Sequence, residues 1–243
     1  MKTVVVLQPQ FFPWRGVFEQ IRLADEFVHL DDAQFQKGGF TNRVQVKTAA
    51  GPLWLTVPVL RAGKLPPIAE VEIDYTSDWR EKHLRTFAMC CARAPFVRSA
   101  QTILEDVYAA RPRTIAELDI AGLERCCAEL GLRPRFTRAS STPVGGAKTD
   151  RLAALLMPRG TTCYVTGLGA LDYLDAPQLA AAGIDVRVMR YTRRPYQQLH
   201  GAFDPHVSIL DTIANLGPAA PSALESIAIA WDDAVAAAAQ VAS

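Results

Sequence analysis

The stretch from residue 3 to residue 21 constrains the fold more than any other part of the chain. Residues 3–7 form a short, β-branched apolar run that predicts a strand buried on both faces of a sheet. The loop 8–16 contains two prolines, which cannot continue a strand ladder or enter a helix interior. From residue 17 onward, apolar residues return at helical spacing. Open α/β folds bind their ligands where a strand passes into a helix through such a loop.

A second buried strand is predicted within residues 25–32, and it ends in two carboxylates, Asp31 and Asp32. Because a helix joins it to the first strand, the two strands should run parallel. The carboxylates would then stand at the same sheet edge as the loop 8–16. A polar and aromatic stretch, residues 34–43, follows directly. We therefore expect two loops rich in binding side chains to face each other.

The rest of the chain continues the α/β pattern around a helical insertion. Further strands are predicted at residues 44–47, 54–59, 68–73, 162–165 and 184–189. Helices fill residues 78–131 and carry few convergent polar side chains. We predict a single α/β domain over residues 1–217, with a mainly parallel, Rossmann-like sheet. The Ala-rich segment 218–243 has few apolar anchors, so little order is expected there.

The charged residues are almost balanced, with 26 Lys and Arg against 25 Asp and Glu and a formal net charge of +1. This balance excludes a broad electrostatic footprint for nucleic acid or a membrane surface. The first apolar run is too short for a signal peptide, and no run approaches the length of a membrane span, so a cytoplasmic protein without membrane insertion is expected. Four of the five cysteines form adjacent pairs in helical patterns, where neighbouring side chains diverge, so no metal site is expected.

Several stretches, taken together, resemble the WbqC-like protein family over residues 3–217. They are Gln8-Pro9-Gln10-Phe11-Phe12-Pro13-Trp14-Arg15-Gly16, residues 25–35, Asn42-Arg43, residues 54–59, residues 164–167 with Tyr173-Leu174, and Tyr196-Gln197-Gln198 through Phe203, Ser208, Ile209 and Asp211. The family usually has a histidine before Gln8, where this chain has Leu7. Its members are bacterial and are encoded among genes for O-antigen, other surface polysaccharides or specialised metabolites, often beside enzymes that make and acylate amino sugars. The resemblance implies a biosynthetic enzyme without specifying a reaction.

A second resemblance is to the layout of the nucleotidylyltransferases, whose signature is His-x-Gly-His. The stretch Trp14-Arg15-Gly16-Val17 occupies the place of that signature, and both histidines are missing. In that fold the histidines stabilise charge on the transferring phosphoryl group. Their absence argues against ordinary nucleotidyl transfer even where the architecture is shared.

The two adjacent carboxylates are the catalytic candidates. Asp31 or Asp32 could hold a metal, orient an amine nucleophile or act as a base. Adjacent strand residues point to opposite faces, so only one of them serves unless the strand has already ended. The alternative is a turn aspartate that caps the next segment. This alternative carries more weight for Asp31 than for Asp32.

Neutral amides and cationic side chains make up most of the predicted binding set. Amides suit the orientation of a substrate, and Lys37 or Arg43 would neutralise a phosphate or carboxylate. Trp14 either packs against its own helix or stacks on a base or sugar. Ser208, three residues before a carboxylate, is most simply a helix N-cap. The full predicted set is Gln8, Trp14, Gly16, Gln34, Lys37, Asn42, Arg43, Gly167, Tyr173, Tyr196, Gln198 and Ser208.

Three functions remain open at this point. The leading hypothesis is a transferase that joins an activated acyl or aminoacyl donor to an amine, with a small-molecule substrate and an acyl thioester or acyl-carrier protein as donor. In it, Asp32 is the base or the amine-orienting group. The second is a nucleotide-dependent ligase or nucleotidyltransferase-like enzyme with the Gly167 turn at phosphate, although a glycine turn alone is a weak signal. The third is a non-catalytic protein that binds a carrier or a glycosyltransferase, which a structure without cavities would favour.

Overall fold

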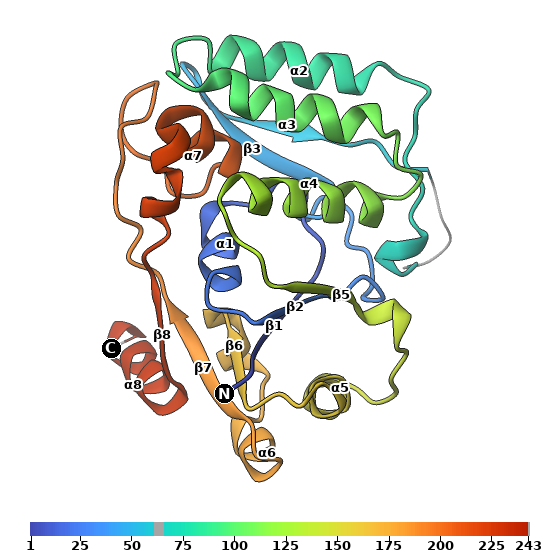
Figure 1. Cartoon of the computed structure of the whole chain (residues 1–243), viewed down its shortest axis with the longest axis vertical. Coiled ribbons are helices and arrows are strands. Elements are labelled where there is room, and N and C mark those ends of the chain that lie inside the picture. Colours follow the sequence, from blue (N-terminus) through green and yellow to red (C-terminus); the bar gives the residue numbers. More distant parts are fainter. Residues whose placement is uncertain (61–65, 243) are drawn as a thin grey trace.

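A six-stranded sheet forms the centre of the protein. The computed structural model describes residues 1–60 and 66–242. Its strand order is β5-β2-β1-β6-β7-β8, in which β8 alone runs antiparallel to its neighbour (Figure 1). The strands are β1 (Thr3–Leu7), β2 (Glu26–His29), β5 (Arg135–Arg138), β6 (Cys163–Thr166), β7 (Asp185–Arg190) and β8 (Ile227–Ala230). The predicted α/β fold with a mainly parallel, Rossmann-like sheet is confirmed.

The strand order reverses beside β1. Helix α1 (Arg15–Ile21) leads from β1 to β2 on one side, whereas β6 pairs with β1 on the other side. Val4 of β1 accordingly lies level with Glu26 of β2 and with Tyr164 of β6. The gap between the carboxyl ends of β1 and β6 is therefore the topological switch point of the sheet, where open α/β folds bind ligands.

Both faces of the sheet are buried, because its central strands carry apolar side chains on alternate sides. Val5, Phe27 and Val165 pack with α1 and with the helical insertion. On the opposite face, Val4 and Tyr164 pack with α5 (Lys148–Leu156) and α6 (Ala176–Ala181). Continuous apolar runs in the sequence are typical of strands covered on both sides.

Three helices fill the range predicted as a helical insertion. They are α2 (Trp79–Cys90), α3 (Val97–Ala109) and α4 (Ile115–Glu129), and they lie together above the sheet in Figure 1. A capping box starts α4, because the Thr114 hydroxyl accepts from the backbone N–H of Glu117 and the Glu117 carboxylate accepts from that of Thr114. No helix within the described residues combines the length and apolar character needed to cross a bilayer.

The chain between β2 and α2 differs in part from the expectation. Strands β3 (Arg43–Thr48) and β4 (Gly51–Thr56) form a separate antiparallel hairpin. The strand predicted at residues 68–73 is wrong, since the 3-10 helix η1 (Ile68–Glu70) stands there. The backbone N–H groups of Ile68 and Ala69 donate to the loop after β2, at Ala33 O and Asp31 O, instead of to a ladder.

The C-terminal segment is more ordered than its composition suggested. Helix α7 (Ile209–Leu216) and the 3-10 helix η5 (Gly217–Ala223) lead to β8, which is followed by α8 (Trp231–Ala242). Strand β8 pairs with β7 over four residues, with Val188 level with Ile229. The segment is held by backbone pairing to the sheet edge, which a count of apolar anchors does not reveal.

Candidate functional site

The loops after β1 and β2 lie side by side at the carboxyl edge of the sheet. The backbone N–H of Leu30 donates to Leu7 O at 2.8 Å, so Gln8 and the two carboxylates follow from neighbouring positions. The side chain of Gln8 is exposed. The turn after β6 begins at Gly167, on the other side of β1. The predicted meeting of loops therefore lies at the switch point.

Asp31 is a fully buried structural carboxylate. Its Oδ2 accepts hydrogen bonds from Arg138 Nε and Ser140 Oγ, both at 2.7 Å, and its Oδ1 accepts from the backbone N–H of Ser140 at 2.9 Å. Burial would raise the pKa of Asp31, but these hydrogen bonds outweigh it and hold the pKa below the ordinary value. Asp31 thus ties the end of β2 to Arg138 in β5 and Ser140 after it, and its side chain does not cap the segment that follows it.

Asp32 has a different environment. Its Oδ2 lies 2.6 Å from Nη2 of Arg151 on α5, in an ion pair of two partly exposed side chains. Its Oδ1 is enclosed and has no hydrogen-bond donor among the described residues. One oxygen is therefore fixed by a cation, and the other is an acceptor without a donor. Of the two carboxylates, Asp32 is the one with unused hydrogen-bonding capacity.

The loop after β1 is packed through its aromatic residues. The indole of Trp14 lies against Tyr191 and His206, with ring centroids 4.9 Å and 5.6 Å away. A Cβ on Gly16 would lie 2.2 Å from the Trp14 ring. Glycine at this position lets the indole fold back onto α1. Trp14 is thus a packing residue in this structure, as one of the two interpretations expected.

Helix α1 buries polar side chains that the sequence analysis did not select. Arg15 is 2% exposed, and its Nη1 donates to Arg194 O at 2.7 Å, whereas its Nε and Nη2 have no hydrogen-bond partner among the described residues. Glu19 Oε1 lies 3.9 Å from Arg15 Nε, and burial raises the pKa of Glu19. Gln20 Nε2 donates to the Tyr191 hydroxyl at 2.6 Å. Arg15 and Glu19 at i, i+4 spacing, beside the Pro/Gly loop, are the signal that would have found them.

The glycines after β6 are not required by the protein itself. Gly167 has an extended backbone, with φ of −86°, and its Cβ would lie at ordinary contact distance, 3.7 Å, from Gln20 and Tyr191. A Cβ on Gly169 would meet nothing within 4 Å. Tyr173, at the end of this turn, is exposed. Nothing within the described residues therefore forbids a Cβ at either glycine.

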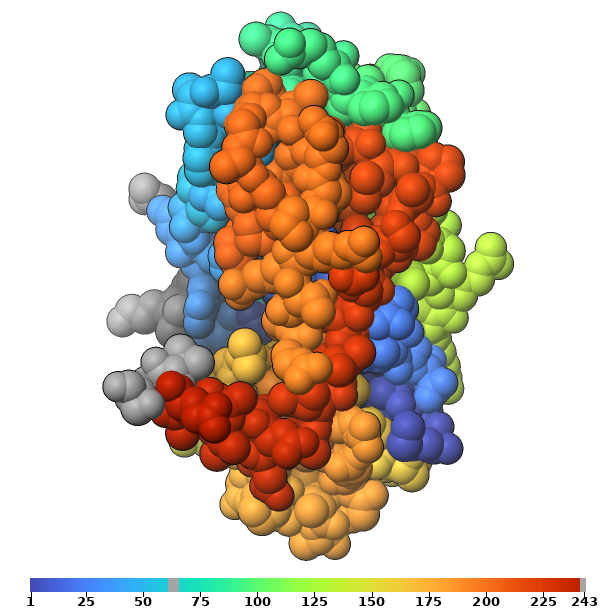
Figure 2. All heavy atoms as spheres, turned by 90° about the vertical axis from the view of Figure 1, so that its left-hand side faces the viewer, coloured from blue at the N-terminus to red at the C-terminus, as the bar shows by residue number. Residues whose placement is uncertain are grey.

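Tyr196, Gln198 and Ser208 belong to the segment 191–208, which crosses one face of the molecule. Figure 2 shows this segment (orange) between β3–β4 (light blue) and α7 (red-orange). Gln198 Nε2 donates to Asp211 Oδ1 at 2.9 Å, and the Tyr196 hydroxyl donates to the same atom at 2.7 Å. Lys47 of β3 donates to Gln198 Oε1 at 3.0 Å. The network fastens this segment to β3 and α7, and Asp32 takes no part in it.

Ser208 caps α7, as predicted. Its hydroxyl accepts from the backbone N–H of Leu210 and donates to Phe12 O at 2.8 Å. Phe12 has a positive φ of 41°, which is unusual for a non-glycine residue. The cap thus also holds the loop after β1 in its conformation, so Ser208 acts on the site through the backbone.

The remaining predicted residues lie near the β3–β4 hairpin or on the surface. Asn42 is buried, and its Nδ2 donates to Val57 O at 3.1 Å. The Arg43 guanidinium lies over the Trp54 ring at 4.2 Å. Gln34 and Lys37 are exposed. The structure therefore does not gather the predicted binding residues around one point.

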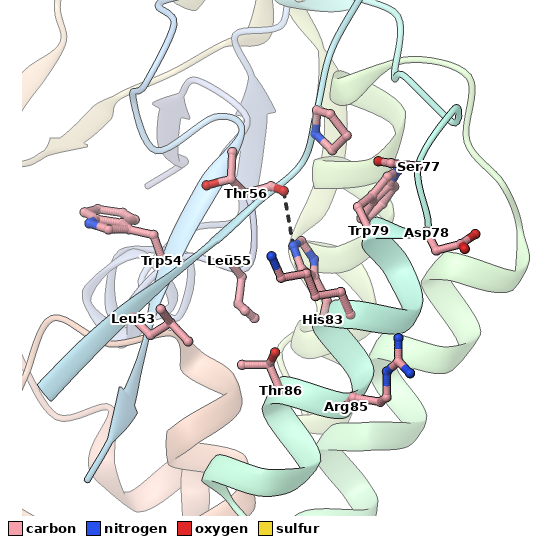
Figure 3. A pocket seen from close by; sticks show the side chains of 12 residues that line it. Leu53, Trp54, Leu55, Thr56, Ser77, Asp78, Trp79, His83, Arg85 and Thr86 are labelled. Atoms are coloured by element: carbon pink, nitrogen blue, oxygen red, sulfur yellow. Dashed lines mark hydrogen bonds between the residues drawn. The ribbon is translucent and has the colours of Figure 1, made fainter. Parts of the chain in front are cut away.

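A cavity of about 640 Å³ lies between β4 and α2. Figure 3 shows Leu53 and Trp54 on one side and Trp79 and His83 on the other. The His83 Nε2 donates to Thr56 O at 3.1 Å, and burial lowers the pKa of His83 to about 4. None of the predicted site residues lines this cavity. We therefore place the candidate site at the carboxyl edge of the sheet, where the carboxylates lie, and not in this cavity.

Comparisons with known proteins give one family and one relative. The model of the WbqC-like protein family matches residues 8–223. An uncharacterized protein of Mycobacterium tuberculosis, Rv1507c, is 35% identical over 227 residues, which cover 92% of this chain and 98% of that protein. No solved structure matches.

Proposed function

Because the chain belongs to the WbqC-like protein family, we propose that it is a biosynthetic transferase that joins an activated acyl or aminoacyl group to an amine. The genes that accompany this family concern surface polysaccharides and specialised metabolites, which suggests an amino sugar or a related amine as acceptor. The sheet places the ends of β1, β2 and β6 together at its switch point, and small-molecule chemistry in such folds occurs at this edge.

One observation carries the proposal: Asp32 is held by Arg151 through one oxygen and has no donor at the other. A carboxylate in this state suits an incoming amine, whose N–H would complete its hydrogen bonding. Asp31 cannot take this role in the same way, because both of its oxygens already accept hydrogen bonds.

The proposed step transfers one proton and one acyl group. The amine nitrogen forms a bond to the acyl carbon, and the bond from that carbon to its thiolate or phosphate leaving group breaks. Asp32 accepts the proton that the nitrogen loses. Arg151 keeps the carboxylate in place during the transfer, so it is a positioning residue.

The experiment is an acyl-transfer assay with acyl thioesters and a panel of amino sugars, followed by release of the free thiol. For an accepted pair of substrates, Asp32→Asn should lower kcat by about 100-fold, since general-base catalysis contributes at least that much. Asp106→Asn, a remote carboxylate on α3 that pairs with Arg125, is the control and should leave kcat unchanged. Full turnover by Asp32→Asn would remove the proposal.

Arg151→Gln sharpens the test. It leaves Asp32 in place without its cation, so kcat should fall less than in Asp32→Asn. Arg151→Lys keeps a cation beside Asp32 and should recover part of the lost kcat, which a variant that loses only stability would not do.

A nucleotide-dependent ligase is the second candidate, and the turn after β6 favours it. Gly167 and Gly169 have no structural need to be glycine, whereas a phosphate that approaches the backbone would require small residues there. Calorimetric titration with ATP and CTP, with and without Mg²⁺, tests this candidate. Binding that Gly167→Val abolishes and Gly167→Ala weakens would favour it over the thioester-dependent transferase.

A further inference from the structure

A second cavity, of about 620 Å³, runs along the edge strand β5 and concentrates positive charge. Four basic side chains line it, from Lys2, Arg135, Arg138 and Arg159, against one acidic side chain, Glu26. The chain as a whole is almost neutral, with a formal net charge of +1. This cavity is therefore a local exception in the charge distribution.

The charge pairing inside the cavity leaves an excess of cations. Glu26 is 2% exposed and holds Lys2 at 2.7 Å and Arg159 at 3.2 Å. Arg138 is paired with Asp31, behind the cavity wall. Four cations thus face two carboxylates, so two positive charges are uncompensated. The Arg135 side chain has no carboxylate partner among the described residues.

Hydrogen bonds hold the side chains of the cavity wall and leave some donors free. Glu26 accepts a further hydrogen bond from the Thr137 hydroxyl at 3.0 Å, and Arg159 Nη1 donates to Leu155 O at 2.6 Å. Arg138 uses only its Nε for Asp31. Its two terminal nitrogens remain for a ligand. Guanidinium groups fixed by neighbours in this way bind phosphate oxygens in pairs.

The geometry points to a binding site for a phosphate-bearing small molecule in the cavity along β5, in which Arg135, Arg138 and Arg159 bind the phosphate. The cavity between β4 and α2 does not share this character, because no buried carboxylate among the described residues holds its two cations, Lys82 and Arg85, whereas Glu26 and Asp31 hold three of the four cations along β5. The lining extends from Lys2, Glu26 and Arg135, at the amino ends of β1, β2 and β5, to Arg138, which pairs with Asp31 after the carboxyl end of β2. Sugar phosphates and nucleotides both carry the required group.

The test is calorimetric titration of the whole protein with inorganic pyrophosphate, glucose 1-phosphate and CDP. Arg135→Gln removes a free cation without leaving a carboxylate unpaired, and it should weaken pyrophosphate binding about tenfold. Thr142→Trp fills the cavity from an exposed lining position and should weaken it as well. The control is Arg93→Gln, an exposed arginine in the turn after α2, which should stay within about twofold of the parent protein.

The three probes distinguish the two sources of phosphate. If CDP binds more tightly than pyrophosphate and both respond to Arg135→Gln, the ligand is a nucleotide. If glucose 1-phosphate binds most tightly, it is a sugar phosphate. Absence of saturable binding of all three probes up to about 1 mM would overturn the proposal. So would binding that Arg135→Gln and Thr142→Trp leave unchanged, or that responds to Gly167→Ala instead. None of these results depends on the transfer reaction.

Discussion

The loop after β1 and the turn after β6 lie at the ends of neighbouring parallel strands, but they differ in how tightly they are packed. The first is fixed by its own packing: Phe11 and Phe12 are about 1% exposed, and Trp14 folds onto Gly16. The second contains two glycines that contact little or nothing. On one side of the switch point the loop 8–16 is thus held by packed side chains, whereas on the other side the backbone of the turn after β6 is largely uncovered.

This difference shows that a conspicuous loop motif can serve either packing or ligand binding. Aromatic residues and prolines in the loop 8–16 resemble a binding loop, yet most of them are needed to hold the loop against α1, α7 and the helical insertion. The glycines of the turn have no such use. A residue type without an internal role is the better indicator of contact with a ligand.

The variant with the largest expected effect is Gly16→Ala, which tests the packing of the loop after β1. Its new Cβ would lie within 2.2–2.7 Å of the Trp14 ring, so the indole must leave its contacts with Tyr191 and His206. We expect a loss of about 2–3 kcal/mol in the free energy of unfolding, measured by urea denaturation. Gly145→Ala is the matched control, since a Cβ there meets nothing within 4 Å. Equal stability of the two variants would contradict the packing role of Trp14.

The second test is the pH dependence that His83 contributes. Phe11 of the loop packs against this imidazole, with ring centroids 5.9 Å apart. Burial lowers the pKa of His83 from 6.5 to about 4, so the unfolded chain binds more protons than the folded chain between these values. Stability should therefore fall as pH falls through this window. From about pH 7.5 to about pH 5 the loss due to His83 should be about 2 kcal/mol.

The contribution is isolated by comparison with His83→Gln. An amide side chain can donate to Thr56 O and accept from the Tyr108 hydroxyl, as the neutral imidazole does, but it does not titrate. Asp31 and other carboxylates titrate in both proteins, so they cancel in the difference. If the two denaturation series run parallel over this range, His83 does not titrate with the shifted pKa.

The central strands of the sheet could be predicted from the sequence, whereas the strands and side-chain roles that depend on tertiary contacts could not. Strands β1 and β6 were recognised because continuous apolar runs mark parallel strands in a covered sheet, and β7 because its valines alternate with charged residues. Strand β5 was missed, since Arg135-Phe136-Thr137-Arg138 is short and half charged, as edge strands often are. Strand β8 was missed because its stability comes from pairing with β7.

The roles of the two carboxylates illustrate the same limit within the site. Their place at the carboxyl end of β2 follows from the local pattern. Which of them is free depends on Arg138, Ser140 and Arg151, more than one hundred positions away along the chain. No local periodicity contains that information, because it is a property of the tertiary structure.

A smaller effect is expected where α7 holds the same loop. Ser208→Ala removes both the N-cap of α7 and the hydrogen bond to Phe12 O, and the buried carbonyl is left without that donor. We expect about 1–2 kcal/mol of destabilisation in thermal and urea denaturation. Ser208→Thr keeps the hydroxyl and should recover part of it. An Ala variant as stable as the parent would show that Phe12 keeps its conformation without the cap.

The smallest effect on stability is expected in the turn after β6. Variants there show whether the turn is only a connection or whether a ligand contacts its backbone. Gly167→Ala and Gly169→Ala should change the free energy of unfolding by at most about 0.5 kcal/mol, and an increase is expected because alanine restricts the unfolded chain. If the turn is only a connection, ligand binding and turnover will also be unchanged. If a ligand approaches the backbone here, the added methyl group will weaken its binding while stability stays constant. A large loss of stability in either variant would show instead that the turn is packed like the loop after β1, and the contrast between the two sides of the switch point would disappear.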